Sequence, residues 1–189
     1  MRTLASSLAL LTLVSSLAAP ASAGTLSGVT LPDRIEVDGR PLVLNGMALR
    51  KKFVIKVYAA GLYLPQKEKD ARKVLQADEP HRMVLHFLYD VSKEQMCDAW
   101  NEGLEANTPN ASADVKKAFG TLCGWMEPID KGNKIVMTYV PGEGTRVEVN
   151  GKAKGTLPGP AVADAILATW IGPKPGPGDD FKSGVLGAS

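Results

Sequence analysis

The order of strand-like and helix-like segments predicts an α+β domain with an antiparallel sheet and helices on one of its faces. Several β-favouring segments come first, two helical segments follow in the middle, and two more strands and a helix end the pattern. Strands that alternate one by one with helices would instead indicate parallel βαβ units. The sequence does not have that alternation, and no internal repeat is visible.

The chain begins with the features of a secretory signal peptide. Arg2 precedes a short apolar run from Leu4 to Leu17, and Ala21-Ser22-Ala23 supplies the small residues of a cleavage site. The run is shorter than the about 20 apolar residues that a membrane-spanning helix needs. We therefore expect residues 1–23 to be removed after Ala23. The mature chain is then exported, most simply to a bacterial periplasm, and has no integral membrane segment.

The segment that follows has the length of one domain. About 165 residues remain, enough for a single core. We expect the domain to span residues 24–172 and residues 173–189 to be a flexible tail, because that segment is rich in Pro and Gly and poor in apolar residues. The 22 basic and 20 acidic residues leave a net charge near zero. This balance argues against broad electrostatic binding to nucleic acid or to an anionic membrane.

Turn signals and residue types indicate the strands. Asp38-Gly39 separates Arg34–Val37 from Pro41–Leu44, which predicts a β-hairpin. Phe53–Leu64 is rich in Phe, Val, Ile and Tyr, which favour strands. The other predicted strands are Arg82–Tyr89, Ile135–Val140 and Thr145–Val149.

The run Phe53–Leu64 contains the best hint of a functional site. Side chains alternate between the faces of a strand, so the face that begins with Phe53 and ends with Tyr63 is apolar and is expected in the core. The other face carries Lys56 and Tyr58 among apolar residues. A cation and a phenol in such a place need water or a partner.

Capping residues and apolar stripes indicate the helices. Ser92 and Gln95 form a capping-box signature. Met96, Trp100 and Leu104 then recur at helical spacing. The other predicted helices are a short one at Asp70–Ala77, one capped by Ser112 with an inward stripe that includes Phe119 and Leu122, and one at Ala161–Ile171 that Pro160 precedes.

The chain has two cysteines, Cys97 and Cys123. Both lie in the predicted helical block, and an exported compartment permits a disulfide between them. The spacing alone does not fix the Cα distance that a disulfide needs, so two buried thiols are an equal alternative. No Cys-x-x-Cys motif is present, which leaves redox chemistry and covalent haem attachment unsupported.

Several segments together resemble the chalcone isomerase-like family over roughly Leu31–Gly172. The resemblance depends on their order and spacing, since no single motif is diagnostic. The segments are Asn45-Gly46, Leu49-Arg50, Lys56–Leu64, the strand-to-helix junction Phe87–Ser92, Gly151, Gly155–Gly159 and Ala165–Gly172.

The resemblance implies an open-faced β-sandwich with a ligand cleft between a large sheet and a helical layer. The enzymes of the family close a chalcone into a flavanone, whereas a non-catalytic branch holds a fatty-acid carboxylate with an arginine and a tyrosine. Arg50 matches the arginine, and Tyr58 matches the tyrosine of the non-catalytic branch, where the enzymes have threonine. The catalytic tyrosine and a helical asparagine of the enzymes fall near Met96 and Gly103, which speaks against isomerase activity.

A fatty acid or a similar apolar carboxylate is therefore the expected ligand. An arginine fork and a phenol supply charge-assisted donors for a carboxylate. Straight strand would separate Arg50 from Tyr58 by roughly 26 Å, so the resemblance implies a reversal near Gly46–Lys52 that brings them together. Met96, Trp100, Leu104, Phe119 and Leu122 are candidates for an apolar wall, and Lys56 and His86 are further candidate ligand contacts.

Other functions are carried as alternatives. Arg50 and Tyr58 would also suit an isomerase or lyase that acts on a phenolic or enone substrate. A structural or partner-binding domain would fill the cleft with its own side chains. Two histidines without spaced partners make a poor metal site, and nothing fixes His86 and Met96 as haem ligands, so neither a metal nor a cofactor is expected. The residues also contain no nucleophile motif, so no catalytic residue is assigned.

Overall fold

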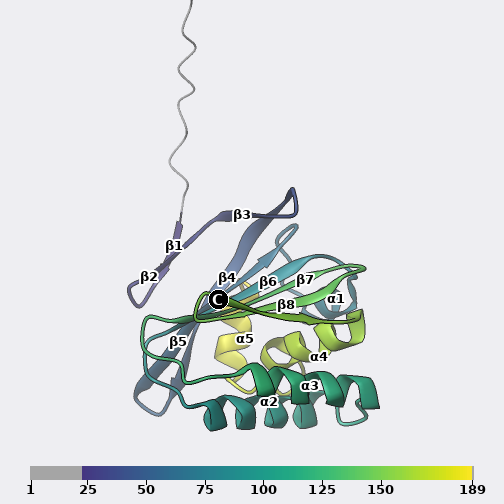
Figure 1. Ribbon diagram of the computed structural model, residues 1–189. Coiled ribbons are helices and arrows are strands. Elements are labelled where there is room, and N and C mark those ends of the chain that lie inside the picture. Colours follow the sequence, from purple (N-terminus) through teal and green to yellow (C-terminus); the bar gives the residue numbers. More distant parts are fainter. Residues whose placement is uncertain (1–22, 189) are drawn as a thin grey trace, which may run out of the picture.

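An antiparallel sheet of seven strands, ordered β3-β4-β5-β6-β7-β8-β9, forms the centre of the computed structural model, which describes residues 23–188 (Figure 1). Each strand pairs with the next one along the chain. The strands are β3 (Arg34–Val37), β4 (Arg40–Lys52), β5 (Ile55–Leu64), β6 (His81–Phe87), β7 (Lys134–Val140), β8 (Gly144–Val149) and β9 (Lys152–Leu157). This confirms the predicted α+β class with an antiparallel sheet.

Two short strands precede the sheet. β1 (Ala23–Leu26) and β2 (Val29–Pro32) form a separate antiparallel hairpin. The predicted signal peptide lies outside the described residues except for Ala23, which begins β1. The sequence analysis gave no strand to this segment or to β9, because their apolar residues are few.

Helices cover one face of the sheet (Figure 1). They are α1 (Ala71–Gln76), α2 (Lys93–Asn107), α3 (Ala113–Trp125), α4 (Pro160–Ile171) and α5 (Asp179–Val185). α4 packs against α2, α3 and β8. It is apolar nearly all round, as expected of a helix buried between two layers. No helix in the described part of the chain is long and apolar enough to cross a membrane.

The two faces of the sheet contact different apolar clusters. Tyr58 and Leu62 of β5 face the larger cluster, which the helices complete. Ala59 and Tyr63 face a smaller cluster under the β1–β2 hairpin, where Leu31 packs against Gly61. Both faces of β5 are therefore buried over most of its length.

β4 and β5 form one long hairpin. The sequence analysis expected a reversal near Gly46–Lys52. The structure corrects this, because β4 continues to Lys52 and the chain reverses at Phe53-Val54. Phe53 lies at that turn and is 91 % exposed, so its expected place in the core is wrong.

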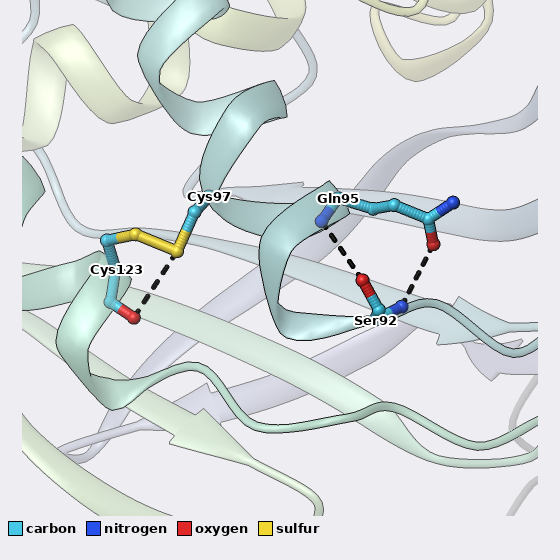
Figure 2. Close-up of a disulfide and its surroundings, with 4 residues drawn as sticks. All are labelled: Ser92, Gln95, Cys97 and Cys123. Carbon is cyan, nitrogen blue, oxygen red and sulfur yellow. Dashed lines mark hydrogen bonds between the residues drawn. A yellow bond between two sulfur atoms is a disulfide. The ribbon is translucent and has the colours of Figure 1, made fainter.

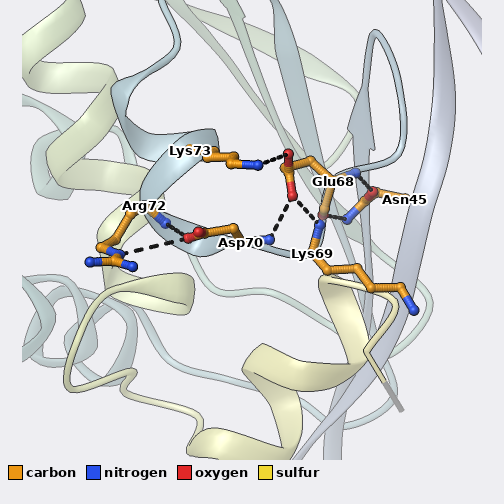
Figure 3. Close-up of polar contacts among 6 residues, drawn as sticks. All are labelled: Asn45, Glu68, Lys69, Asp70, Arg72 and Lys73. Carbon is orange, nitrogen blue, oxygen red and sulfur yellow. Dashed lines mark hydrogen bonds and ion pairs between the residues drawn. The ribbon is translucent and has the colours of Figure 1, made fainter.

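Asn45 is accommodated in β4 by an irregularity in the strand pairing. The register with β5 shifts between Leu44 and Gly46, and the Asn45 side chain is buried. Its amide donates to the carbonyl oxygens of Glu68 and Val185 at 3.0 Å, and its Oδ1 accepts from the Glu68 N–H at 2.8 Å (Figure 3). Glu68 in turn accepts from the N–H groups of Lys69 and Asp70. One buried amide thus joins β4 to the loop before α1 and to α5.

The expected caps of the two central helices are present. Ser92 Oγ accepts from the Gln95 N–H at 3.3 Å, and Gln95 Oε1 accepts from the Ser92 N–H at 2.9 Å, which completes the capping box (Figure 2). Ser112 accepts from the Val115 N–H at the start of α3. A disulfide between Cys97 and Cys123 joins the two helices (Figure 2).

The expected flexible tail is wrong for the last helix. Phe181, Val185 and Leu186 are buried in the main core, and α5 packs against β4. Gly46 permits this approach, since an added Cβ would lie 2.7 Å from Gly187 N and 2.8 Å from Val185 O. The sequence analysis did not predict this helix because residues 173–189 contain few apolar side chains, although those few form one buried stripe.

A cleft between the sheet and α2

A cleft of about 700 Å³ lies between the sheet and the helical layer. The β4–β5 hairpin and Leu85 of β6 line one side, and α2 lines the other. Thr169 and Trp170 of α4, together with Lys174, Gly176 and Pro177, complete the wall. This volume is in the range of small-molecule sites in proteins.

Arg50 and Tyr58 line this cleft together. They are directly opposite each other in the β4–β5 pairing, so their side chains share one face of the sheet. The reversal at Phe53-Val54 brings them together. Arg50 forms no hydrogen bond or ion pair with the other residues of the described part, 23–188, so its guanidinium donors are available to a ligand.

Tyr58 is a buried phenol that can donate its proton. Its oxygen accepts from Trp170 Nε1 at 3.2 Å, and its ring lies against Phe87 and Phe181. Because a phenol has one proton and can also accept, this contact leaves the O–H free. Burial raises the pKa of Tyr58 to about 12, despite the opposing hydrogen bond from Trp170 and the charge of Arg50. The group is therefore a neutral donor near pH 7.

Trp100 lines the cleft and carries a buried indole donor. Its ring packs edge-on against Trp170, with 5.2 Å between centroids. Only 3 % of Trp100 is exposed, and its Nε1–H has no partner among the described residues. A buried donor of this kind in a native protein calls for a partner such as a bound molecule or a water.

Two of the predicted contacts lie outside the cleft. The register shift between Arg50 and Lys51 leaves Val57 as an extra residue of β5, so the alternation of faces changes there. Val57 consequently lines the cleft and Lys56 does not. His86 is opposite Ala59 on the other face of the sheet, which also separates it from Met96.

Other wall residues differ from those expected. Met96 and Trp100 line the cleft as predicted, whereas Leu104, Phe119 and Leu122 pack in the main core. The sequence analysis did not single out Leu85, Thr169, Trp170 or Lys174. The sequence could have indicated Trp170, since this residue belongs to one of the segments that carry the family resemblance.

Charged groups of both signs surround the cleft. Arg50 and Lys52 lie on the hairpin side, with Lys174 in the segment after α4. Asp98 and Glu102 lie on α2, and Asp90 precedes that helix. Among the described residues there is no cluster of three or more His, Cys, Asp or Glu side chains that could hold a metal ion.

A sequence model of the family described as chalcone isomerase-like matches residues 23–187. The chain belongs to the chalcone isomerase-like family. The match includes α5, so the family domain extends beyond the residues 24–172 that the sequence analysis expected.

The chain is also similar to a solved structure of this family's fold. This is the crystal structure of a fatty-acid binding protein from Arabidopsis thaliana, with a TM-score of 0.69 and 17 % sequence identity over 87 % of this chain and 96 % of that chain. At this identity the likeness shows the fold. No curated protein matches the sequence.

Two positions bear on the isomerase chemistry of the family. Met96, which the resemblance places near the position of the catalytic tyrosine, has a thioether in place of a phenol and lines the cleft. Gly103, which the resemblance places near the position of the asparagine, packs against α4, and an added Cβ would lie 2.8 Å from Thr169 Cγ2. The backbone approach between α2 and α4 therefore leaves little room for an amide side chain at Gly103.

Proposed function

We propose that the cleft binds a fatty acid or a similar apolar carboxylate, without catalysis, after export of the protein to the periplasm. The observation that carries the proposal is the direct pairing of Arg50 and Tyr58 across β4 and β5, with both side chains in the cleft. One solved structure with this fold is that of a fatty-acid binding protein, which supports the choice of ligand class.

The head of such a ligand finds its donors at these two residues. A carboxylate accepts charge-assisted hydrogen bonds from a guanidinium and a further bond from the Tyr58 O–H. The Trp170 Nε1–H holds the phenol oxygen at 3.2 Å and so favours an O–H that points away from Trp170.

The tail of the ligand needs apolar surface without unpaired polar groups. Val57 and Leu85 on the sheet and Met96 and Ala99 on α2 supply apolar side chains on two sides of the cleft. Met has a flexible, polarisable side chain that adapts to irregular ligands. The wall therefore suits an acyl chain better than a polar metabolite.

Isomerase or lyase activity on a phenolic or enone substrate is the alternative for the same donors. Met96 has no proton to transfer or donate, and Gly103 has no amide, so neither could help to stabilise an enolate there. We expect chalcone cyclisation in the presence of the protein to be no faster than in buffer. Turnover above that rate, lost in Arg50→Ala, would contradict the non-catalytic proposal.

Native mass spectrometry of protein purified from its exported fraction tests carriage directly. We expect a co-purifying acyl chain in the wild type and its loss in Arg50→Ala. Arg34→Ala is the matched control, because Arg34 is an exposed arginine on β3 outside the cleft. Ligand-free wild-type protein that also fails to bind added fatty acid would overturn the proposal and favour a structural or partner-binding domain.

A further inference from the structure

The turn of the β4–β5 hairpin exposes apolar side chains to solvent. Phe53 is 91 % exposed and Val54 is 94 % exposed, while Ile55 and Tyr89 are 39 % and 52 % exposed. These are the large hydrophobic residues that the described part of the chain, 23–188, leaves exposed. Phe53, Ile55 and Tyr89 also line the cleft, so the patch surrounds the cleft's mouth.

The residues at the turn contradict local preference. A two-residue hairpin turn favours Asn, Asp and Gly, yet this one contains Phe53 and Val54. Phe53 also has a positive φ of 56°, which a bulky side chain rarely adopts. A sequence that breaks burial and turn preferences at the same point indicates a role for the exposed side chains themselves.

The same hairpin end carries only positive charge. Arg50, Lys51, Lys52 and Lys56 flank the turn, and no acidic residue occurs between Gly39 and Lys67. Lys51 and Lys56 are directly opposite each other, a pairing that like charges make unfavourable. None of the four cations forms an ion pair with another residue in the part of the chain that the structure describes.

We propose that this hairpin end, Arg50–Lys56, binds the surface of an anionic phospholipid bilayer. The Phe53 and Val54 side chains enter the interface, and the flanking cations contact the phosphate headgroups. The near-zero net charge of the whole chain does not oppose this, because the attraction of a surface acts over a local cluster within about one Debye length of it.

Charge favours a bilayer over a second copy of the chain as the occupant. Two hairpin ends packed together would bring their cations into contact without an acidic partner, which repulsion opposes. The acidic groups near the cleft, Asp90, Asp98 and Glu102, are on α2 or just before it and not on the hairpin. In the proposed arrangement the hairpin end makes the contact and the cleft's mouth faces the lipid. The inference goes beyond ligand carriage and does not require it.

Vesicle flotation tests the proposal. The full mature protein is mixed with vesicles of phosphatidylcholine alone, or of phosphatidylcholine and phosphatidylglycerol in equal parts. We expect binding to the second kind, weakened by salt. Lys51→Gln/Lys56→Gln should bind roughly 25-fold more weakly, at about fivefold for each lysine near the surface. The matched control, Lys116→Gln/Lys117→Gln, removes two exposed lysines of α3 and should bind as the wild type does.

A second variant tests how much the apolar side chains Phe53 and Val54 contribute to vesicle binding. Phe53→Asn/Val54→Gly installs the turn sequence that two-residue hairpins prefer, so the fold is retained while the apolar tip is removed. We expect vesicle binding to fall roughly tenfold or more. Unchanged thermal unfolding of each variant confirms that the fold is intact.

Three results would overturn the proposal. The first is that wild type binds both kinds of vesicle equally, and the second is that the two double-lysine variants lose vesicle binding to the same extent. The third is that wild type binds no vesicles and forms a dimer, which Phe53→Asn/Val54→Gly converts to a monomer. The last result would assign the patch to a second copy. Lys51 and Lys56 do not line the cleft, so fatty-acid binding by Lys51→Gln/Lys56→Gln in vesicle-free buffer should persist and separates this proposal from ligand carriage.

Discussion

Tyr58 and Tyr63 are buried phenols on the same strand that face opposite sides of the sheet. Tyr58 lines the cleft, where its oxygen accepts from Trp170. Tyr63 lies in the smaller cluster and donates to the Pro32 carbonyl at 2.9 Å. The pair therefore offers a comparison in which the chemical change is the same and only the location differs.

Tyr58→Phe should weaken binding of a fatty acid by about tenfold or more, because it removes one hydrogen bond to a charged group. It should also destabilise the fold by about 1–3 kcal/mol, since Trp170 Nε1–H would lose its buried acceptor. Displacement of a fluorescent fatty acid and urea unfolding measure the two effects.

Tyr63→Phe is the control for this prediction. It removes a phenol hydroxyl from the other face of the sheet, so it should lower stability without a change in affinity. Equal affinities of Tyr58→Phe and wild type would show that the Tyr58 hydroxyl does not contact the ligand.

At this scale the sequence supplied the residue types and the structure supplied their partners. The resemblance to the family indicated Arg50 and Tyr58 from their positions in the chain. Alternation along the strand suggested Lys56, and His86 was a further candidate contact, but both are outside the cleft. For Lys56 the cause is a single extra residue in β5, because one inserted residue exchanges the faces of a strand and local alternation does not reveal where that occurs. His86 is outside the cleft because β6 pairs it with Ala59, on the other face of the sheet.

At the scale of elements, α5 has the largest consequence. Its Phe181 packs edge-on against Tyr58, with 5.9 Å between centroids, and the segment before it supplies Lys174, Gly176 and Pro177 to the cleft. The segment that looks like a linker thus completes both the core and the site.

Gly46→Ala should loosen this helix from β4. The new Cβ would overlap Gly184 O and crowd the backbone of Val185 and Gly187, which cannot move as a flexible side chain would. We expect the free energy of unfolding to fall by about 2–3 kcal/mol, the range of overpacked sites, and ligand affinity to fall with it. Urea unfolding and hydrogen exchange of α5 amides measure the effect.

Gly120→Ala is the matched control. Gly120 lies within α3, and an added Cβ there meets nothing within 4 Å. Alanine in a helix interior should raise the free energy of unfolding by up to about 1 kcal/mol. A Gly46→Ala protein as stable as wild type would mean that α5 does not pack on β4 as described.

At the scale of the whole molecule, buried ionisable groups link stability to pH. His81 lies against Tyr139, and burial lowers its pKa to about 4, although a backbone contact with Glu79 opposes the shift. The folded protein therefore holds the neutral form more strongly than the unfolded chain does. This contribution to stability is complete above the ordinary histidine pKa of about 6.5 and is lost as the pH falls toward 4.

When the pH is lowered from about 7 to about 5, the free energy of unfolding should therefore fall by about 2 kcal/mol more in wild type than in His81→Phe. Denaturant unfolding at a series of pH values measures the difference, and the comparison cancels the groups that both proteins share. One such group is Asp164. Burial raises the pKa of Asp164 to about 6, so the contribution of its protonated form to stability is lost as the pH rises.

His86→Gln serves as the control for His81→Phe. His86 lies on the other face of the sheet and is less buried than His81. The His86→Gln protein should therefore still lose most of the stability that wild type loses at low pH. Identical pH profiles for wild type and His81→Phe would contradict a neutral, buried His81.

The sequence by itself determined the α+β class, most element positions, both helix caps and the family to which the chain belongs. These features depend on local patterns: turn residues, capping residues and apolar spacing act within a few positions of one another. The tertiary structure alone decided the Phe53-Val54 reversal that pairs Arg50 with Tyr58, the docking of α5 and the disulfide between Cys97 and Cys123. Each of these depends on contacts between residues distant in the chain, where the free energy of packing outweighs the preference of any one segment.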